Sequence, residues 1–497
     1  MDMNTSVDAA SDRGVVIVGG GPAGLTAAHE LTSRSLRPIV LEMSEHVGGI
    51  ARTENYKGFR FDIGGHRFFT KVAPIRELWH EVMGSDFIRV RRLSRIYYRG
   101  KFFSYPLRIP NTLKNLGLYE SVRILLSYFK WQTMPHEIEE NFEQWVTNRF
   151  GRRLFLHFFQ GYTEKVWGIP CSKIRADWAA QRIQNLSLYR AAINAMTGRH
   201  DTSTLITEFF YPRLGPGMMW ERFRDIIEER GGTVQLRSRV KGLVHERGRV
   251  QSVVIEQDGK TSRLECSHVI STMPLATLIQ QLYPAPPAYV QDAANQLKYR
   301  DFLIVVLILD IPDPFPDNWI YIHSSDVNVG RIQNFRSWSA EMIPDPNKSS
   351  IGMEYFCNEN DGLWAMPDME LIEMAKHEIA HLGLAEERTV IDATVIRQPK
   401  AYPVYDEHYS EAVDIIRSYL GSFSNLQTIG RNGMHRYNNQ DHSMLTAILA
   451  ARNVFGARHD VWNVNIERSY HEEFTTTHHD DSGSGHATAD SGRLKQA

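Results

Sequence analysis

Three glycines near the N-terminus are spaced for binding a dinucleotide. In VVIVGGGPAGLTAAHEL a β-branched run leads into Gly19, Gly21 and Gly24, and a helical pattern follows directly. The first glycine permits a tight turn, the second lets backbone approach a pyrophosphate, and the third lets helix pack on strand. Glu42 ends the next strand, RPIVLE, where a carboxylate can accept hydrogen bonds from a ribose. A glycine-rich turn without a ligand is the alternative, but the strand–helix–strand–acid context favours a cofactor.

A second glycine-rich stretch follows the first. The segments EHVGGIART and FRFDIGGHRFFTK contain Gly48, Gly49, Arg52, Gly65 and His66. Paired glycines let the main chain lie close to a flat ligand, and the guanidinium of Arg52 can meet a phosphate. A simple NAD dehydrogenase would have little use for this second cluster. His66 is a candidate catalytic residue, with a capping or core histidine as the alternative.

Polar residues also precede a helical pattern near the other end of the chain. The run RYNNQDHSMLTAILAA places Gln440, Asp441, His442 and Ser443 before apolar residues. Free N–H groups and the positive dipole end of a helix can hold an anion, so a negatively charged group is expected here. The alternative is that Asp441 or Ser443 only caps the helix, although capping and ligand contact can coexist.

These stretches together resemble the FAD-binding family that includes amine oxidases, protoporphyrinogen oxidase and UDP-galactopyranose mutase. In the mutase, a pair like Gly65 and His66 lies beside the flavin ring. Its NQDHS loop and the following helix close over the flavin from the far end of the chain. The resemblance therefore implies FAD as the cofactor, with residues 440–443 among its contacts.

Four further stretches narrow the resemblance to the mutase. YTEKVWGIP resembles the segment whose tryptophan lies at the substrate site, here Trp167. LKYRDF and KAYPVY resemble segments that carry a substrate arginine and a tyrosine, here Arg300 and Tyr402. IGRNGMHRYNNQDHSM carries Arg431 and Tyr437 and looks like the eukaryotic type of the mutase.

The sequence departs from the mutase pattern in two places. GGHRFFTK differs from the usual run after the histidine, and residues 321–356 have no matching segment. These departures leave open which sugar, or which reaction, the enzyme handles.

The resemblance implies a ring isomerisation of the UDP-galactopyranose/furanose type without net redox change. In the mutase, N5 of reduced FAD attacks the anomeric carbon and UDP leaves, so that a flavin N5–sugar adduct forms. Such a site must bind a diphosphate. Arg300 and Arg431 can meet phosphate oxygens bidentately, while Tyr402 and Tyr437 can each donate one hydrogen bond.

The source of electrons for the flavin is a separate question. NAD(P)H is a candidate reductant that would bind transiently, because only one GxGxxG follows a clear strand. The other candidate, LGPGMMW at residues 214–220, follows no clear strand and is expected to return the chain to the FAD domain.

Composition excludes several classes of protein. The formal net charge is −2, which gives no electrostatic footprint for nucleic acid. Cys171, Cys266 and Cys357 have neither disulfide nor metal spacing, so we assign no metal and expect a reducing compartment. FLIVVLIL, at residues 302–309, is too short to cross a bilayer and predicts a buried strand. Residues 1–13 lack the apolar region of a signal peptide, so a cytoplasmic location is expected, with homo-oligomerisation left open.

The predicted fold is α/β. It comprises a discontinuous Rossmann-type FAD-binding domain, an inserted helical domain and a mixed β-sheet substrate domain. Leu118, Val122, Leu125, Leu126 and Phe129 recur at helical spacing, and the basic run at residues 87–103 predicts a hairpin with its turn at Arg99–Gly100. The predicted ranges are 14–75, 215–275 and 420–460 for the FAD domain, 105–214 for the helices, and 76–104 and 276–419 for the sheet domain. Residues 1–13 and 478–497 are predicted to be disordered.

Two other functions remain alternatives at this point. The first is an FAD-dependent two-electron oxidase or desaturase of an amine, a porphyrinogen or another small substrate, whose site would be apolar and aromatic and would lack an arginine pair. The second is a non-catalytic FAD-binding protein that uses its helical layer for partners. The leading prediction is a mutase-like flavoenzyme acting on a nucleotide sugar.

Overall fold

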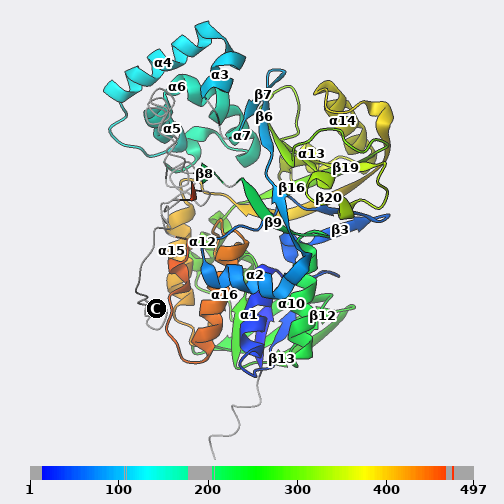
Figure 1. Ribbon diagram of the computed structural model, residues 1–497. Coiled ribbons are helices and arrows are strands. Elements are labelled where there is room, and N and C mark those ends of the chain that lie inside the picture. The colour runs from blue at the N-terminus through cyan, green and yellow to red at the C-terminus, as the bar shows by residue number, and fades with distance from the viewer. Residues whose placement is uncertain are drawn as a thin grey trace, which may run out of the picture.

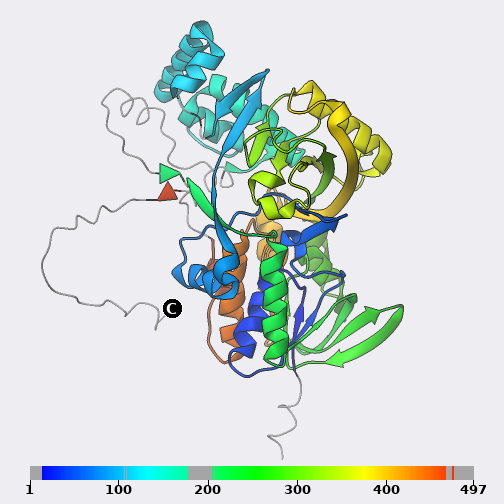
Figure 2. The same ribbon diagram turned by 45° about the vertical axis from the view of Figure 1, so that its right-hand side comes forward.

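The computed structural model describes residues 14–176 except 106 and 108, residues 204–205 and 207–465, and residues 473–474. The predicted disordered ends, 1–13 and 478–497, lie outside the described residues, as does part of the predicted helical range. Figures 1 and 2 show three regions: a dinucleotide domain at the bottom, a sheet domain at the upper right and a helical layer at the upper left.

A five-stranded parallel sheet forms the centre of the dinucleotide domain. Its order is β10-β2-β1-β14-β21. The strands are β1 (Val15–Val18), β2 (Ile39–Leu41), β10 (Thr233–Gln235), β14 (His268–Ser271) and β21 (Leu426–Thr428). These strands come from all three ranges predicted for the FAD domain. Their parallel pairing brings the three segments together in one sheet.

Alternation along β1 directs its side chains into two cores. Val15 and Ile17 pack on the side covered by α1, α2, α10 and α16. Val16 and Val18 pack on the opposite side, against α11, α12, α15 and a four-stranded sheet. The helices are α1 (Pro22–Thr32), α2 (Ala73–Met83), α10 (Gly217–Glu229), α11 (Leu275–Gln280), α12 (Ala288–Gln296), α15 (Tyr409–Leu420) and α16 (Gln440–Val454). Thus α2, α11, α12 and α15 pack on the dinucleotide sheet, although most of their residues fall in the ranges predicted for the substrate sheet domain.

A separate four-stranded sheet packs on the second face of the dinucleotide sheet. The order of this sheet is β13-β12-β11-β15. Its strands are β11 (Ser238–Glu246), β12 (Arg249–Gln257), β13 (Lys260–Glu265) and β15 (Leu282–Tyr283).

A seven-stranded mixed sheet forms the second region, in the order β20-β16-β19-β18-β17-β6-β7. Its strands are β6 (Ser94–Tyr98), β7 (Lys101–Ser104), β16 (Tyr299–Leu309), β17 (Trp319–Ile322), β18 (Arg331–Asn334), β19 (Ser349–Cys357) and β20 (Val390–Pro403). The predicted strand at 302–309 is confirmed and fully buried in β16. The predicted hairpin is confirmed for residues 94–104, where β6 and β7 pair antiparallel around Arg99 and Gly100, both at positive φ. Residues 87–91 of the same run instead pair with residues 208–212.

The helical layer contains α3 (Ile109–Leu116), α4 (Leu118–Thr133), α5 (Phe142–Phe150), α6 (Arg152–Phe155) and α7 (Gly161–Trp167). Its core is aromatic and includes Phe142, Trp145 and Phe155. The predicted helix at Leu118 is confirmed as α4. Ile124 and Tyr128 form its buried face, whereas the apolar residues that predicted the helix face outward. Within the part of the chain that the structure describes, every helix is too short or too polar to span a bilayer.

One expectation about LGPGMMW was wrong. A strand does precede it, β9 (Glu208–Pro212), but this strand pairs antiparallel with β5 (Phe87–Arg91) outside the parallel sheet. The N–H of Gly217, at the start of α10, donates to Oγ1 of Thr53 at 2.9 Å. Because Thr53 fills this position, the turn does not form a second dinucleotide site, and α10 returns the chain to the dinucleotide sheet through β10, as expected.

Gly24 sets the approach of α1 to β1. A Cβ at Gly24 would lie 1.9 Å from the carbonyl oxygen of Gly19. We expect Gly24→Ala to cost about 1–3 kcal/mol or more through overpacking and to lower the thermal unfolding midpoint. Gly161→Ala, in α7 with no described atom within 4 Å of the added Cβ, is the matched control and should leave the midpoint unchanged or raise it, because alanine favours a helix over glycine. Equal midpoints for the two variants would contradict this account.

Candidate functional site

The two glycine-rich stretches meet at the start of α1. The N–H of Gly48 donates to the carbonyl of Gly20 at 2.8 Å, and a Cβ at Gly49 would lie 3.3 Å from Cα of Gly21. Gly48 and Gly49 both have positive φ, at 103° and 54°. No described side chain caps the N-terminus of α1. The N-terminus of α1 therefore offers free N–H groups in its first turn. Together with the backbone of the two glycine turns, at residues 19–21 and 48–49, which carries no side chains, these groups form a cradle that can bind an anionic ligand.

Glu42 and Arg52 stand on either side of this cradle. The Glu42 carboxylate accepts the N–H of Gly20 at 2.6 Å and that of Ser44 at 2.8 Å, which fixes it at the end of β2. Arg52 Nε donates to Glu54 at 2.6 Å, and its Nη1 donates to the Gly49 carbonyl at 3.0 Å. The predicted ribose and phosphate roles of Glu42 and Arg52 stay predictions, in positions that suit them.

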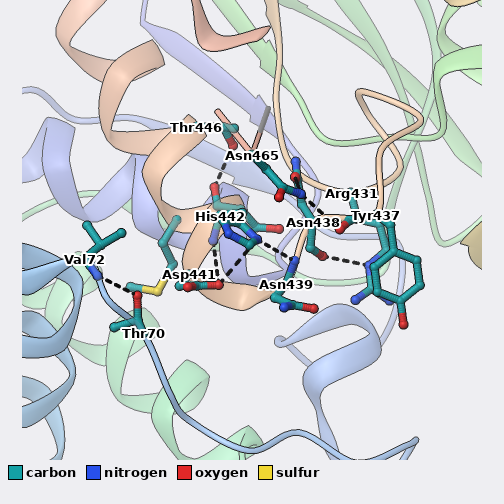
Figure 3. A network of polar contacts seen from close by, with 12 residues as sticks. Thr70, Val72, Arg431, Tyr437, Asn438, Asn439, Asp441, His442, Thr446 and Asn465 are labelled. Atoms are coloured by element: carbon teal, nitrogen blue, oxygen red, sulfur yellow. Dashed lines mark hydrogen bonds and ion pairs between the residues drawn. The ribbon is translucent and has the colours of Figure 1, made fainter. Parts of the chain in front are cut away.

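A cavity of about 520 Å³ lies between the start of α16, the sheet domain and the loop after β4 (Phe59–Asp62). Figure 3 shows Asn439 and His442 between Thr70 on one side and Arg431 and Tyr437 on the other. The lining includes Gly65, His66, Arg67, Trp319, Tyr321, Arg331, Trp338, Tyr402, Arg431, Tyr437, Gln440, Asp441 and His442. The structure thus brings the predicted Gly65–His66 pair, Tyr402, Arg431, Tyr437 and most of the NQDHS loop to one cavity.

Asn439 occupies the N-cap position of α16. The N–H of Asn439 donates to Nδ1 of His442 at 3.3 Å, and Asp441 Oδ1 accepts the His442 N–H at 2.9 Å. The buried Oε1 of Gln440 has no hydrogen-bond partner among the described residues. Ser443 is buried and does not line the cavity. Gln440, Asp441 and His442 are therefore placed for ligand contact, and Ser443 is not.

His66 is held as a neutral imidazole. Burial, together with the nearby charges of Arg431 and Arg331, lowers its pKa to about 3. Its Nδ1 is buried without a hydrogen-bond partner in the described part of the chain. A neutral imidazole with an unused ring nitrogen can donate or accept one hydrogen bond from a ligand in the cavity.

Arg431 lies against two stacked tyrosines. Its guanidinium is 4.7 Å from the ring of Tyr437 and 5.5 Å from that of Tyr402, and these rings stack at 5.6 Å. Its Nε donates to the Asn438 carbonyl at 2.9 Å. Burial raises the pKa of Tyr402 to about 12, with Tyr437 adding to the shift, so its phenol remains a donor. Trp167 is buried and packs against both tyrosine rings at 6.3 and 6.2 Å, behind the cavity wall.

Arg300 does not reach the cavity. Its guanidinium donates to the carbonyls of Val166, Lys165 and Phe356 at 3.0, 3.3 and 2.7 Å. A Cβ at Gly168 would lie 2.6 Å from Cζ of Arg300, so only glycine permits this contact. The geometry gives Arg300 the role of tying α7 to β19 rather than that of facing a ligand.

Arg331, like Arg67, is a cavity arginine that the sequence did not single out. It stands on β18 directly across from Glu354 on β19, and its Nε donates to the buried Glu354 carboxylate at 2.5 Å. Gln333 also donates to Glu354. With Nε fixed, the Nη edge of Arg331 faces Gly64, where an added Cβ would lie 3.6 Å from Nη2 and 3.9 Å from the Tyr402 hydroxyl. The signal available in the sequence was one basic residue in RIQN and one acidic residue in SSIGMEYFC, two segments that each carry a single charge.

A lysine anchors the loop between β17 and β18. Lys165 Nζ donates to the carbonyls of Ser324, Val327 and Val329 at 2.7, 2.9 and 3.1 Å. His323, in the same loop, stacks on Tyr162 at 4.5 Å. Since α7 carries Lys165, this helix also positions the strands that bear Trp319 and Arg331.

The sequence over residues 22–394 matches a family described as flavin containing amine oxidoreductase. This chain belongs to that family. The chain is also 34% identical over 125 residues to amine oxidase [flavin-containing] B of Bos taurus, an alignment covering 24% of this chain and 22% of that protein. The chain therefore spans about a fifth of the length of that relative.

Solved structures share the fold over nearly the whole chain. A reduced UDP-galactopyranose mutase has a TM-score of 0.79 at 20% identity, covering 92% of this chain and 99% of that one. Putrescine oxidase bound to putrescine has a TM-score of 0.58 at 15% identity, covering 90% and 99%. These results confirm a mixed α/β fold related to FAD-dependent amine oxidases and the mutase.

The residues present fit a flavin dinucleotide. The glycine cradle and the open N-terminus of α1 suit a pyrophosphate, and Glu42 suits a ribose. The partnerless Oε1 of Gln440 and Nδ1 of His66 belong to residues that line the cavity where a flat ring with polar edges would lie. FAD, the cofactor that the family supports, would therefore be held from both ends of the chain.

Four buried histidines make the fold acid-sensitive. Burial lowers the pKa of His66 and of His323 to about 3, and that of His29 and His435 to about 4. The unfolded chain takes up these protons below pH ~6.5, whereas the folded chain does not, so stability falls as pH drops from about 6.5 toward 3.

We expect His323→Phe to keep the stacked ring and reduce this acid sensitivity by up to about a quarter, because one of four such titrations is removed. Thermal unfolding midpoints between pH 7 and pH 4 measure the slope. His46→Phe, at an exposed position, should keep the wild-type slope. A His323→Phe slope equal to that of the wild type would contradict the assignment.

Proposed function

We propose that this chain is an FAD-dependent, mutase-like enzyme that isomerises the sugar ring of a nucleotide sugar. The observation that carries the proposal is the charge of the cavity. Arg67, Lys71, Arg331 and Arg431 line it, against the two carboxylates of Asp441 and Asp460. This excess of positive charge suits a diphosphate and disfavours an ammonium substrate.

Arg331 and Arg431 are the proposed diphosphate ligands. Each has its Nε engaged by the protein, Arg331 by Glu354 and Arg431 by the Asn438 carbonyl. Fixing Nε orients the Nη atoms, so that less conformational entropy is lost when a phosphate binds. In this proposal Arg331 takes the place that the sequence motif assigned to Arg300.

The other cavity side chains have distinct proposed roles. Tyr402 and Tyr437 donate hydrogen bonds, with Trp167 behind them holding their rings in place. Trp319 and Trp338 supply flat apolar surface to border a sugar or base. Reduced FAD, when bound, supplies the nucleophile for the anomeric carbon, and NAD(P)H is the proposed reductant. Neutral His66 donates or accepts one hydrogen bond beside the flavin ring. This contact helps to orient the reacting groups without adding a charge.

A second function, two-electron oxidation or desaturation, is favoured by the family that the chain matches over residues 22–394, flavin containing amine oxidoreductase, and by one relative. The curated relative from Bos taurus is a flavin-containing amine oxidase. However, its alignment covers only 24% of this chain. The cationic lining, which includes Arg331 and Arg431, also opposes the binding of an ammonium substrate.

Activity separates the two functions. We expect the dithionite-reduced protein to convert one member of a panel of UDP- and other nucleotide-sugars into a ring isomer, detected by chromatography, while the oxidised protein does not. The reason is that the proposed chemistry needs reduced flavin and consumes no electrons. Substrate-dependent oxygen consumption with peroxide release, and no isomer, would instead establish an oxidase.

The arginine assignment predicts a binding result. We expect Arg331→Met, made together with Glu354→Gln so that no buried carboxylate is left unpaired, to weaken the affinity of the reduced protein for UDP by about 10- to 100-fold. The reason is that a charge-assisted hydrogen bond contributes roughly 1.5–3 kcal/mol. Isothermal calorimetry measures this change. Arg239→Met, at an exposed position on β11, is the control with unchanged affinity. Loss of affinity in Arg300→Met but not in the double variant, with both proteins folded, would return the role to Arg300.

A further inference from the structure

The outer face of α4 exposes a continuous apolar surface. Leu118, Val122, Leu125, Leu126 and Phe129 are between 45% and 82% exposed, and they recur at positions that share one side of the helix. The opposite side packs inward through Ser121, Ile124 and Tyr128. An apolar face of this kind on a surface helix marks a place where something else binds.

Basic side chains border this face. Lys114 on α3 and Arg123 and Lys130 on α4 are all exposed. Glu120 is the one acidic residue of the two helices, and it is turned away to pair with Arg153 and His157. The outward surface of α3 and α4 therefore carries apolar side chains and basic side chains, and the acidic residue of these two helices does not face outward.

Acidic residues lie beyond the end of α4. Glu137, Glu139 and Glu140 follow in the loop before α5, where Glu139 pairs with Arg149 at 2.5 Å. These glutamates lie outside α4, so the charged residues beside its apolar face are the basic ones named above.

We propose that α4 docks this protein on an anionic lipid surface. The helix would lie parallel to the membrane, with Leu125, Leu126 and Phe129 entering the boundary between headgroups and acyl chains. Arg123 and Lys130 would remain at the level of the anionic headgroups. Apolar burial and attraction to negative lipids then act together, as in interfacial amphipathic helices.

A second copy of the chain fits this face less well. In a two-fold interface the same surface meets itself, so the basic border of one α4 would approach the basic border of the other. An anionic surface, in contrast, complements that border. Figures 1 and 2 show α4 at the outer edge of the helical layer, away from α1 and α16, so docking leaves the dinucleotide domain uncovered.

Flotation with lipid vesicles tests the proposal on the full chain. We expect wild-type protein to float with vesicles of phosphatidylglycerol and phosphatidylcholine, to stay in solution with phosphatidylcholine alone, and to be released by high salt. The combined variant Leu125→Gln/Leu126→Gln/Phe129→Gln should bind at least about tenfold less, because three apolar contacts are lost. Arg123→Gln/Lys130→Gln should also weaken binding.

The matched control is Met369→Gln/Ile391→Gln, which removes two exposed apolar residues from the sheet domain and should bind like the wild type. Far-ultraviolet circular dichroism and thermal midpoints establish that each variant is folded. Wild-type protein that ignores anionic vesicles, or a triple variant that binds them equally, would overturn the proposal. A wild-type dimer that the triple variant dissociates, without vesicle binding, would assign the face to a second copy instead.

Discussion

The contact between α1 and β1 is the constraint on which the cofactor half of the molecule depends. Gly24 brings the helix so close to the turn that a Cβ would meet the Gly19 carbonyl. This approach fixes where the N-terminus of α1 points and where the second glycine turn, tied to Gly20 by the Gly48 N–H, lies against it. Helix α16 then packs on α1 and places its own first turn beside the cavity. The close contact at Gly24 thus sets the positions of two helix N-termini, that of α1 and, through its packing on α1, that of α16.

A buried ion pair has the corresponding role in the other half. Glu354 has no exposed surface, and Arg331 and Gln333 both donate to it. Breaking such a pair leaves a buried charge without a partner, which is strongly destabilising. The pair therefore fixes the orientation of the Arg331 guanidinium at the cavity wall. Lys165 donates to three carbonyls of the loop between β17 and β18, and so holds in place the connection between Trp319 and Arg331.

Sequence reasoning succeeded where local spacing carries the information. The GxGxxG turn, the strand at 302–309, the Arg99–Gly100 hairpin and the α4 periodicity are all present, since each depends on neighbours within one turn or strand. It failed where position depends on distant partners. Arg300 matches a motif, but its environment includes the carbonyls of α7 and Phe356, which no local pattern reveals. Likewise, the sequence could not show that the apolar face of α4 points to solvent. Periodicity shows that apolar residues share one side of a helix, but not whether that side packs on the rest of the protein.

The cavity is assembled from two kinds of sequence. One side comes from residues 64–66 and the start of the NQDHS helix, which resemble family motifs, and the other wall comes from β17 and β18, which match none. These two strands belong to a different sheet and are secured by their own ion pair and loop anchor. Substitutions within residues 319–338 would therefore reshape one wall of the cavity without touching the glycine turns or the first turn of α16, so the two sides of the cavity can be changed independently.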